Sequence, residues 1–454
     1  MHVLLTGGTG LIGSRLGISL VRAGHTVTSM TRSGKAAELP FPNNCIQWNH
    51  QDVMAADVLF GNSESYDAVI HLAGEPVAQR WTRRARERIH SSRVQSSRAL
   101  IESLKRGRTP PPIWINASAV GIYGNAGSVQ LTEKSDRGAG FLSDVCFDWE
   151  AELKALSPST RAVAVRFGVV LSLAGGALPK MLGPIQYGLG GNIASGKQWI
   201  SWIHVDDAVR AILHVLSQDS ITGPINVVAP EALTNGEFTE KLTATLKMPG
   251  FISVPKIVLK AILGEMSTIL VDGANVFPNK LLASGFVFSF PSLQSAFDNL
   301  FGPSPIRGAH YFYASQWIKK PVDETFDFFS RAENLEKITP PELAFKIIAK
   351  SSSEMGRGLL IDYTLRIKKV PIHWRTRIES WNPPHSFVDT QLRGPYRIWH
   401  HTHHFEALGD GTLMSDVVQY KMHAWPFGDV ALPFVQGDIT SIFSYRKKVI
   451  SKIV

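Results

Sequence analysis

Short apolar runs alternate with amphipathic stretches along the first 227 residues of the chain. The apolar runs are brief enough to be buried strands, whereas the stretches between them show the spacing of apolar positions that is typical of helices. Strands that alternate with helices in this way predict a parallel, doubly wound α/β sheet, whose ligands bind at the carboxyl ends of the strands. The principal strands are expected at residues 3–6, 25–30, 45–48, 67–73, 113–118 and 161–166.

The pattern changes twice in the second half of the chain. Residues 228–300 are helix-rich and interrupted by prolines, so we predict a small helical cap that completes a first domain of residues 1–300. Residues 301–308 are rich in proline and glycine and are predicted to form a linker to a second domain, residues 309–454.

The second domain has an apolar period close to two, which predicts an antiparallel sheet. Its strands are expected at residues 310–319, 359–368, 373–381, 396–406 and 412–423, and a long helix is expected from about residue 427 to residue 452. A helix packed on a curved sheet is an α+β, helix-grip arrangement that commonly leaves an apolar cavity between the two layers.

Three spaced glycines, Gly7, Gly10 and Gly13, lie between the first predicted strand and the helix expected at residues 14–23. In a dinucleotide site one glycine allows the tight turn, one lets the backbone approach the pyrophosphate, and one allows the helix to pack closely on the strand. The amino end of the helix then offers free N–H groups to the anion. The spacing therefore predicts a Rossmann-type dinucleotide site.

The end of the second strand indicates which dinucleotide binds. No carboxylate stands there to hold the ribose hydroxyls of NAD, and Arg32 lies where an arginine would accommodate a 2′-phosphate. We therefore expect NADP(H) as the cofactor. The alternative is that Arg32 is a solvated residue at the end of a strand. Asp52, after the third strand, is placed either to meet the adenine edge or to sit in a solvated loop.

Composition limits the class of protein. The chain has 454 residues, of which 44 % are hydrophobic, and this is enough for two or three globular domains. Its two cysteines, Cys45 and Cys146, exclude a disulfide framework and fit a reducing, cytoplasmic compartment. We expect neither a secretion signal nor a membrane span, because no apolar stretch approaches about 20 residues.

The formal net charge is +9, and the basic residues are scattered apart from a cluster at residues 80–88. No ladder of aromatic and basic residues accompanies that cluster, so no nucleic-acid partner is expected. The partners expected are a small-molecule substrate and an apolar ligand for the second domain. A homodimer is kept open.

Several motifs together resemble the extended short-chain dehydrogenase/reductase superfamily and, within it, the atypical "epimerase family" branch. They are TGGTGLIG at residues 6–13, HLAGE at 71–75, SAVGIYG at 118–124, RFGVVL at 166–171 and WIHVDDA at 202–208. The resemblance covers about residues 1–300. It implies cofactor contacts from Gly7, Thr9, Gly10, Leu11, Ile12, Gly13, Arg32, Asp52, Leu72, Ala73, Gly74, Glu75, Arg93 and Arg166. Residues 308–454 resemble the helix-grip superfamily that includes START domains and polyketide cyclases.

The sequence departs from the superfamily at its catalytic dyad. The resemblance implies a serine after the fifth strand, which is Ser118 here, and a Tyr-x-x-x-Lys pair on the next helix. Cys146 and Glu150 stand where the tyrosine and the lysine belong. A glutamate cannot lower the pKa of a neighbouring acid by its charge as a lysine does. The candidate catalytic residues are therefore Ser118, Cys146 and Tyr123, with Glu75 as a further relocated acid, and each of the last three has a purely structural alternative.

Two groups of histidines invite a metal or acid/base interpretation. His204, followed by Asp206 and Asp207, is explained more simply as the start of a helix. His401 and His403 face the same side of a predicted strand, but a third ligand is not evident, so no metal site is predicted. We expect the cavity of the second domain to be lined by His401, His403, Trp374, Trp381 and Arg375.

These observations predict an NADP(H)-dependent epimerase or reductase that acts on a small carbonyl or carbinol substrate and carries a ligand-binding second domain. A glycine-rich segment, residues 188–202, is expected to face the substrate through Lys197, Gln198, Trp199 and Trp202. Because the dyad is missing, the alternative is a sensor that binds NADP(H) without turnover. A third possibility is cyclase or dehydratase chemistry in the second domain.

Overall fold

The computed structural model describes residues 1–55, 58–59, 65–106, 109–250, 252–302, 305–368, 370–423 and 432–453. The chain divides into two compact units: unit 1 is Met1–Ala36 with Asn43–Pro305, and unit 2 is Ala37–Pro42 with Ile306–Val454. The division between residues 305 and 306 falls inside the predicted linker, of which residues 303–304 lie outside the described part. The described helices include none that is long and apolar enough to cross a bilayer.

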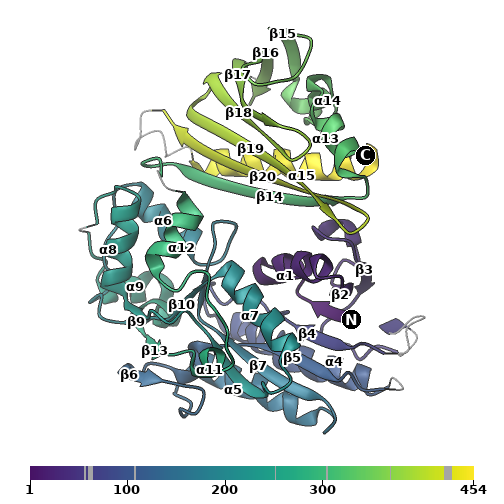
Figure 1. The fold of residues 1–454 in the computed structure, drawn as a ribbon. Helices are drawn as coiled ribbons and strands as arrows, with labels where there is room; N and C mark the ends of the chain where they lie inside the picture. Colours follow the sequence, from purple (N-terminus) through teal and green to yellow (C-terminus); the bar gives the residue numbers. More distant parts are fainter. Residues whose placement is uncertain are drawn as a thin grey trace. The chain divides into compact units, whose positions relative to one another are not determined.

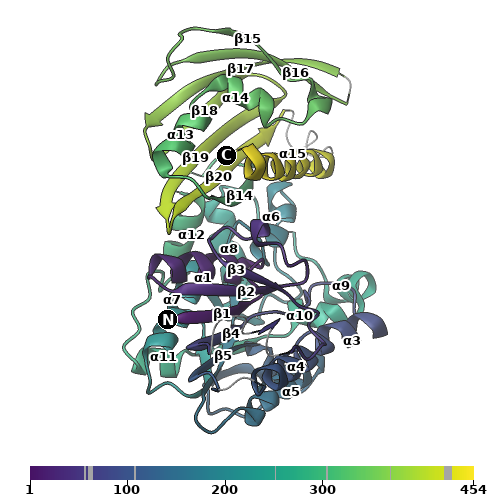
Figure 2. The ribbon, with the colours of Figure 1, turned by 90° about the vertical axis from the view of Figure 1, so that its right-hand side faces the viewer.

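Unit 1 is built on a seven-stranded parallel sheet, as predicted (Figure 1). Its strands, in spatial order, are β3 (Asn44–Gln47), β2 (Thr26–Thr31), β1 (His2–Thr6), β4 (Ala68–His71), β5 (Ile113–Ala119), β7 (Arg161–Phe167) and β11 (Gly223–Val227). Figure 2 shows β1 between β2 and β4. The order of the strands reverses at this point, so a crevice for a ligand is expected at the carboxyl ends of β1 and β4.

Helices cover both faces of this sheet (Figure 1). Helix α1 (Leu11–Arg22) packs against α7 (Val205–Ser217), whereas α4 (Val94–Leu104) packs against α5 (Phe141–Ala151). The central strands are largely apolar because they are buried between the two helical layers, and Val3, Leu4 and Leu5 are completely buried. The remaining described elements of this part are α3 (Arg83–Ser91), β6 (Gly127–Leu131), β8 (Val169–Leu171), α6 (Leu178–Gln186), β9 (Trp199–Ile200) and β10 (Trp202–His204).

The predicted cap is a set of short elements after β11. They are β12 (Leu233–Thr234), α8 (Asn235–Thr245), α9 (Lys256–Leu263), α10 (Thr268–Val271), β13 (Ala274–Val276), α11 (Asn279–Ala283) and α12 (Leu293–Phe301). Asp207 of α7 ties this segment to the sheet domain. Its completely buried carboxylate accepts hydrogen bonds from the backbone N–H groups of Ser289 (2.9 Å) and Phe290 (2.8 Å) and from Arg210 (2.7 Å).

Unit 2 is a seven-stranded antiparallel sheet with helices on it. In spatial order its strands are β14 (His310–Ile318), β20 (Gly411–Met422), β19 (Tyr396–Leu408), β18 (Ser386–Arg393), β17 (Val370–Asn382), β16 (Leu360–Ile367) and β15 (Lys346–Lys350). Its helices are α13 (Val322–Phe329), α14 (Ala332–Lys337) and the long C-terminal α15 (Leu432–Ile453). The predicted start of that helix, residues 427–431, lies outside the described residues.

The sequence pattern identified five of these seven strands and missed β15 and β18. Strand β18 has mixed polar and apolar positions and only Phe387 is fully buried among its residues, so it lacks the clear alternation of the other strands. Its place in the sheet is set by its pairing with β17 and β19.

We predict that the Asp207→Asn variant loses about 2–3 kcal/mol of unfolding free energy, because an amide cannot accept the three hydrogen bonds with a full negative charge. The measurement is urea denaturation of the full chain followed by tryptophan fluorescence. Asp206→Asn is the matched control. Asp206 forms a half-exposed ion pair with Arg15, so its loss is expected to cost less than about 1 kcal/mol. Equal effects of the two variants would contradict the role given to Asp207.

Candidate functional site

The turn after β1 brings backbone unusually close to the end of β4. Gly7 has a φ of +74°, and a Cβ added there would lie 2.8 Å from the carbonyl carbon of Leu72. A Cβ on Gly13 would overlap the carbonyl oxygen of Gly7. Any side chain at either position therefore forces the turn, the helix and β4 apart. The two glycines therefore leave the turn lined with backbone where the crevice is expected.

Helix α1 presents its amino end at this turn. Its N-cap residue is Gly10, which supplies no side-chain cap, and its first turn contains no acidic residue. Thr9 and Gly10 are exposed, and Leu11 and Ile12 are half-buried. Free N–H groups and the positive end of the helix dipole make this a suitable place for a phosphate.

A buried hydrogen-bond chain fixes the two strand ends to each other. The Thr6 hydroxyl lies 2.7 Å from Nδ1 of His71 and accepts hydrogen bonds from the N–H groups of Leu72 and Ala73, both at 3.2 Å. On its other side His71 reaches the Ser96 hydroxyl at 3.1 Å. Burial lowers the pKa of His71 to about 3, so the imidazole is neutral. The glycine spacing does not predict these hydrogen bonds. They fix the ends of β1 and β4 without any charged group.

A hydrogen bond from Arg93 fixes the backbone of the segment after β4, residues 72–75. Its guanidinium donates to the carbonyl oxygens of Glu75 and Ile89, both at 3.0 Å, and lies where a side chain at Gly74 would be. It also stacks over the Trp149 ring at 5.3 Å. The Glu75 N–H donates to Ser92 at 2.9 Å, so the backbone of residues 74–75 is fixed beside the crevice.

The two residues expected near the adenosine are both exposed. Arg32 follows directly on the last residue of β2, next to the strand that carries the glycine turn. Asp52 lies beyond β3, where its carboxylate accepts a hydrogen bond from Asn49 at 2.9 Å and its carbonyl accepts one from the Trp48 indole at 3.1 Å. The chain thus places an exposed guanidinium, that of Arg32, and a carboxylate, that of Asp52, on the β2–β3 side of the sheet.

A buried ion pair occupies the position of the missing dyad. Glu150 receives two parallel hydrogen bonds from Arg166, at 2.8 and 2.7 Å, and both side chains are at least 85 % buried. The Ser118 hydroxyl donates to the same carboxylate at 2.7 Å. Burial alone would lower the pKa of Arg166, but the hydrogen bonds and charge of Glu150 raise it above the usual arginine value. A positive charge is therefore present near this position, on β7 instead of on the helix.

Tyr123 is part of the same network and is fully buried. Its hydroxyl accepts a hydrogen bond from Arg166 at 2.9 Å and lies within donating distance of Asn226 (2.8 Å) and the Thr132 carbonyl (3.0 Å). Burial raises the pKa of this phenol, although Arg166 opposes the shift. Three protein groups thus hold the phenol, which is the arrangement of a positioning residue.

Cys146 lies one helical turn before Glu150 on α5 and is buried. Burial and the charge of Glu150 together raise the pKa of the thiol to about 11, although Arg93 opposes the shift. The thiol is therefore neutral near pH 7 and is not a nucleophile. Of the three candidates Ser118, Tyr123 and Cys146, Ser118 is the one whose hydroxyl donates directly to Glu150, and it also hydrogen-bonds with the Cys146 side chain.

The other predicted features of unit 1 are structural. His204 caps α7, because its Nδ1 accepts a hydrogen bond from the Asp206 N–H at 3.1 Å; this confirms the simpler interpretation. In the segment expected to face a substrate, Trp202 is completely buried and the Gln198 amide donates to the carbonyls of Ile193 (2.9 Å) and Leu270 (3.0 Å). These two side chains stabilise the segment, and Lys197 is exposed.

Unit 2 encloses a second site, an apolar cavity of about 560 Å³ between the sheet, α13–α14 and α15. Trp374, His401 and His403 line it, as expected. The expectation for Arg375 is wrong: its side chain is on the opposite face of β17, where it pairs with Asp362, because neighbouring residues of a strand face opposite ways. Trp381 packs between Phe326 and Phe387 and is not among the cavity-lining residues.

Carboxylates that the sequence pattern missed lie beside these histidines. Asp389 of β18 and Asp416 of β20 flank the pair from the two neighbouring strands. Burial alone would lower the pKa of His401, but the charges and hydrogen bonds of the two aspartates raise it to about 9. The cluster thus contains two carboxylates, Asp389 and Asp416, in addition to the two histidines that the sequence pattern predicted.

Comparisons with known proteins agree with the geometry of unit 1. Residues 3–228 match the model of the NAD dependent epimerase/dehydratase family, and residues 254–300 match a domain of unknown function, DUF1731. An epimerase family protein of Staphylococcus saprophyticus is 36 % identical over 301 residues, which cover 66 % of this chain and 99 % of that protein. The matched models end at residue 300, before the antiparallel sheet begins.

Solved structures give the same result. The human epimerase family protein SDR39U1 (isoform 2), crystallised with NADPH, is 33 % identical with a TM-score of 0.59, covering 66 % of this chain and 99 % of that one. A nucleoside-diphosphate sugar epimerase from Corynebacterium glutamicum is 30 % identical with a TM-score of 0.54, covering 67 % of this chain and 59 % of that one.

We predict that Glu150→Gln costs about 3 kcal/mol or more of unfolding free energy, because it leaves the buried Arg166 cation without its partner. Glu152→Gln is the control. Glu152 pairs with Arg98, whose side chain is 63 % exposed, so its replacement is expected to cost less than about 1 kcal/mol. Chemical denaturation of both variants measures the difference. A loss as small for Glu150→Gln as for the control would show that the pair is not a stabilising element.

Proposed function

Because this chain belongs to the NAD-dependent epimerase/dehydratase family, we propose that unit 1 is an NADP(H)-dependent epimerase or reductase of a small carbonyl or carbinol substrate. The observation that carries the proposal is the glycine turn against β4, which admits no side chain at Gly7 or Gly13 and presents the uncapped amino end of α1. The presence of NADPH in the human relative supports the choice of cofactor.

The residues that would hold the cofactor follow the crevice. The N–H groups of Leu11 to Gly13 would bind the pyrophosphate, with Gly10 at the turn before them, and the backbone of residues 72–75, fixed by Arg93, would lie along the nucleotide. Arg32 would bind the 2′-phosphate, and Asp52 the adenine side. When bound, the nicotinamide ring supplies or accepts a hydride. Arg166, expected to touch the cofactor, instead acts through Glu150 in this proposal.

In the proposed proton transfer Ser118 is the residue that touches the substrate oxygen. Its hydroxyl accepts the proton of a substrate carbinol and passes its own proton to Glu150, 2.7 Å away. Arg166 holds Glu150 in position through two hydrogen bonds, and in this proposal the glutamate acts as a base and not as a substitute for lysine. In the reverse direction the same two groups return a proton to a carbonyl oxygen. Tyr123 positions Arg166, and Cys146 fills space beside Ser118.

Unit 2 is proposed to bind an apolar or amphipathic small molecule. Its cavity of about 560 Å³ has the size of a small-molecule site, and most of the side chains around it are aliphatic or aromatic. This proposal fits the resemblance to helix-grip proteins, and it does not depend on turnover in unit 1.

The cofactor preference is tested by Arg32→Asp. The variant is expected to weaken NADPH binding at least tenfold while leaving NADH binding unchanged or improved, because a carboxylate repels a 2′-phosphate and can accept hydrogen bonds from ribose hydroxyls. Titration calorimetry with each nucleotide measures the ratio. Arg22→Asp, at the far end of α1, makes the same change in net charge and serves as control. An unchanged ratio in Arg32→Asp would show that the cofactor assignment is wrong.

Turnover is tested on panels of carbonyls with NADPH and of carbinols with NADP⁺, followed by nicotinamide absorbance. Ser118→Ala is expected to lose about a hundredfold or more in kcat, because it removes the group that exchanges a proton with the substrate. Cys146→Ala is expected to keep most of the wild-type rate. Tight NADPH binding with no turnover of any substrate would favour the sensor alternative, and a selective loss in Cys146→Ala would transfer the acid role to the thiol.

A further inference from the structure

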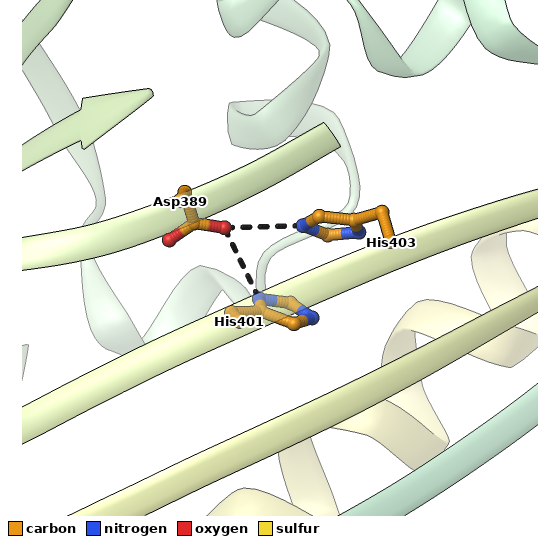
Figure 3. A group of neighbouring side chains, drawn as sticks. All are labelled: Asp389, His401 and His403. Atoms are coloured by element: carbon orange, nitrogen blue, oxygen red, sulfur yellow. Dashed lines mark hydrogen bonds and ion pairs between the residues drawn. The ribbon is translucent and has the colours of Figure 1, made fainter. Parts of the chain in front are cut away.

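The buried histidines of unit 2 form a compact cluster with two carboxylates. His401 and His403 project from the same face of β19, two residues apart. Asp389 of β18 is opposite His401, and Asp416 of β20 is opposite His403. Figure 3 shows Asp389 facing both imidazole rings across the neighbouring strands. The cluster therefore results from sheet register, which brings four polar side chains from three strands into a buried layer.

One oxygen of Asp389 faces one nitrogen of each histidine. Its Oδ2 lies 3.1 Å from Nε2 of His403 and 3.4 Å from Nδ1 of His401 (Figure 3). The three atoms lie within 4.8 Å of one another. A tetrahedral ion with bonds of about 2.0–2.1 Å holds its ligand atoms roughly 3.3 Å apart. The two separations from Asp389 are thus already close to those of a coordinated set.

We propose that Asp389, His401 and His403 bind a divalent first-row transition metal ion of the Zn²⁺ or Fe²⁺ type, with a coordination position open to the cavity of unit 2. Two imidazoles and one carboxylate are a donor set that such ions prefer, whereas Mg²⁺ and Ca²⁺ prefer oxygen ligands alone. Three protein ligands leave a fourth position for water or for an oxygen of a guest molecule.

Asp416 has the place of an outer-shell partner. Its Oδ1 lies 3.0 Å from Nε2 of His401 and 2.9 Å from Nδ1 of His403, which are the ring nitrogens that do not face Asp389. A carboxylate on the far nitrogen fixes the orientation of a metal-binding imidazole and strengthens its donation. Nδ1 of His403 is buried and makes no aligned hydrogen bond despite this short distance. A small rotation of the ring on metal binding would complete that hydrogen bond.

The three proposed ligands line the cavity of unit 2, and Asp416 does not. Asp389, His401 and His403 line the cavity together with Arg446 of α15, whereas Asp416 is not among the lining residues. The Nε of Arg446 is buried without a hydrogen-bond partner of its own. A guest with an anionic or carbonyl oxygen could therefore meet both the ion and the guanidinium, with its apolar part among the aromatic side chains of the cavity.

The competing interpretation is a closed network of ion pairs that needs no ion, in which the two histidines simply neutralise the two aspartates. The two interpretations differ in metal content and not in fold. Full-length protein without a histidine tag is stripped with a chelator, and Zn²⁺, Co²⁺ and Mg²⁺ are then added separately. Binding is measured by titration calorimetry and by metal analysis after dialysis. We expect one tightly held Zn²⁺ or Co²⁺ per chain, a Co²⁺ absorption spectrum typical of nitrogen and oxygen ligands, and no tight binding of Mg²⁺.

Variants locate the site. Asp389→Asn, His401→Gln and His403→Gln are each expected to weaken Zn²⁺ binding at least a hundredfold, and Asp416→Asn by about 10–100-fold. His400→Gln and His404→Gln, on the opposite face of β19, are the matched controls and should bind as wild type. Circular dichroism verifies that each variant is folded. Failure of folded wild-type protein to retain Zn²⁺, or equal binding by the variants and the controls, would overturn the proposal. Neither readout involves NADPH or turnover, so this result is independent of the function proposed for unit 1.

Discussion

The close approach of backbone to backbone at the end of β1 is the constraint on which unit 1 depends. Gly7 contacts the main chain of Leu72 and Ala73, and Gly13 contacts Gly7, at distances that no side chain allows. This contact sets three things at once: the entry angle of α1, the distance between β1 and β4, and the free amino end of the helix. The neutral hydrogen-bond chain from Thr6 through His71 to Ser96 then holds the strand ends in that arrangement.

The second feature of unit 1 is the position of its buried cation, which lies on a strand and not on the helix that follows the serine. Superfamily members of the usual kind have a cation on the helix that follows the serine, and here Glu150 occupies that position on α5. The cation is Arg166, on the neighbouring strand β7, and it holds the glutamate through two hydrogen bonds. A negative group beside Ser118 is suited to accept a proton, whereas a cation beside a tyrosine is suited to release one. The proposed proton transfer therefore uses the same local layout with the charges reversed.

Unit 2 shows how sheet register creates a site from residues that are far apart in the sequence. The histidines of β19 were recognisable as a pair because a strand alternates its faces. Their carboxylate partners could not be recognised from the sequence. Asp389 lies on a strand without clear alternation, and nothing in the sequence around Asp416 distinguishes it from other polar residues of a strand. Pairing of β18 and β20 on either side of β19 brings both to the histidines. The same alternation places Arg375 on the face of β17 away from the cavity, so its expected place in the cavity lining is wrong.

The sequence by itself determined the elements whose signal is local. The glycine spacing, the strand–helix alternation of residues 1–227, the capping role of His204 and the change of period in the second half could be predicted because each depends on neighbours along the chain. The tertiary structure alone decided the contacts between distant residues: the Glu150–Arg166 pair, the commitment of Tyr123 to Asn226, and the joining of Asp389 and Asp416 to the histidines. The physical reason is that hydrogen bonds and ion pairs act over about 3 Å in space, and separation along the chain says nothing about which partners the packing of strands will bring within that reach.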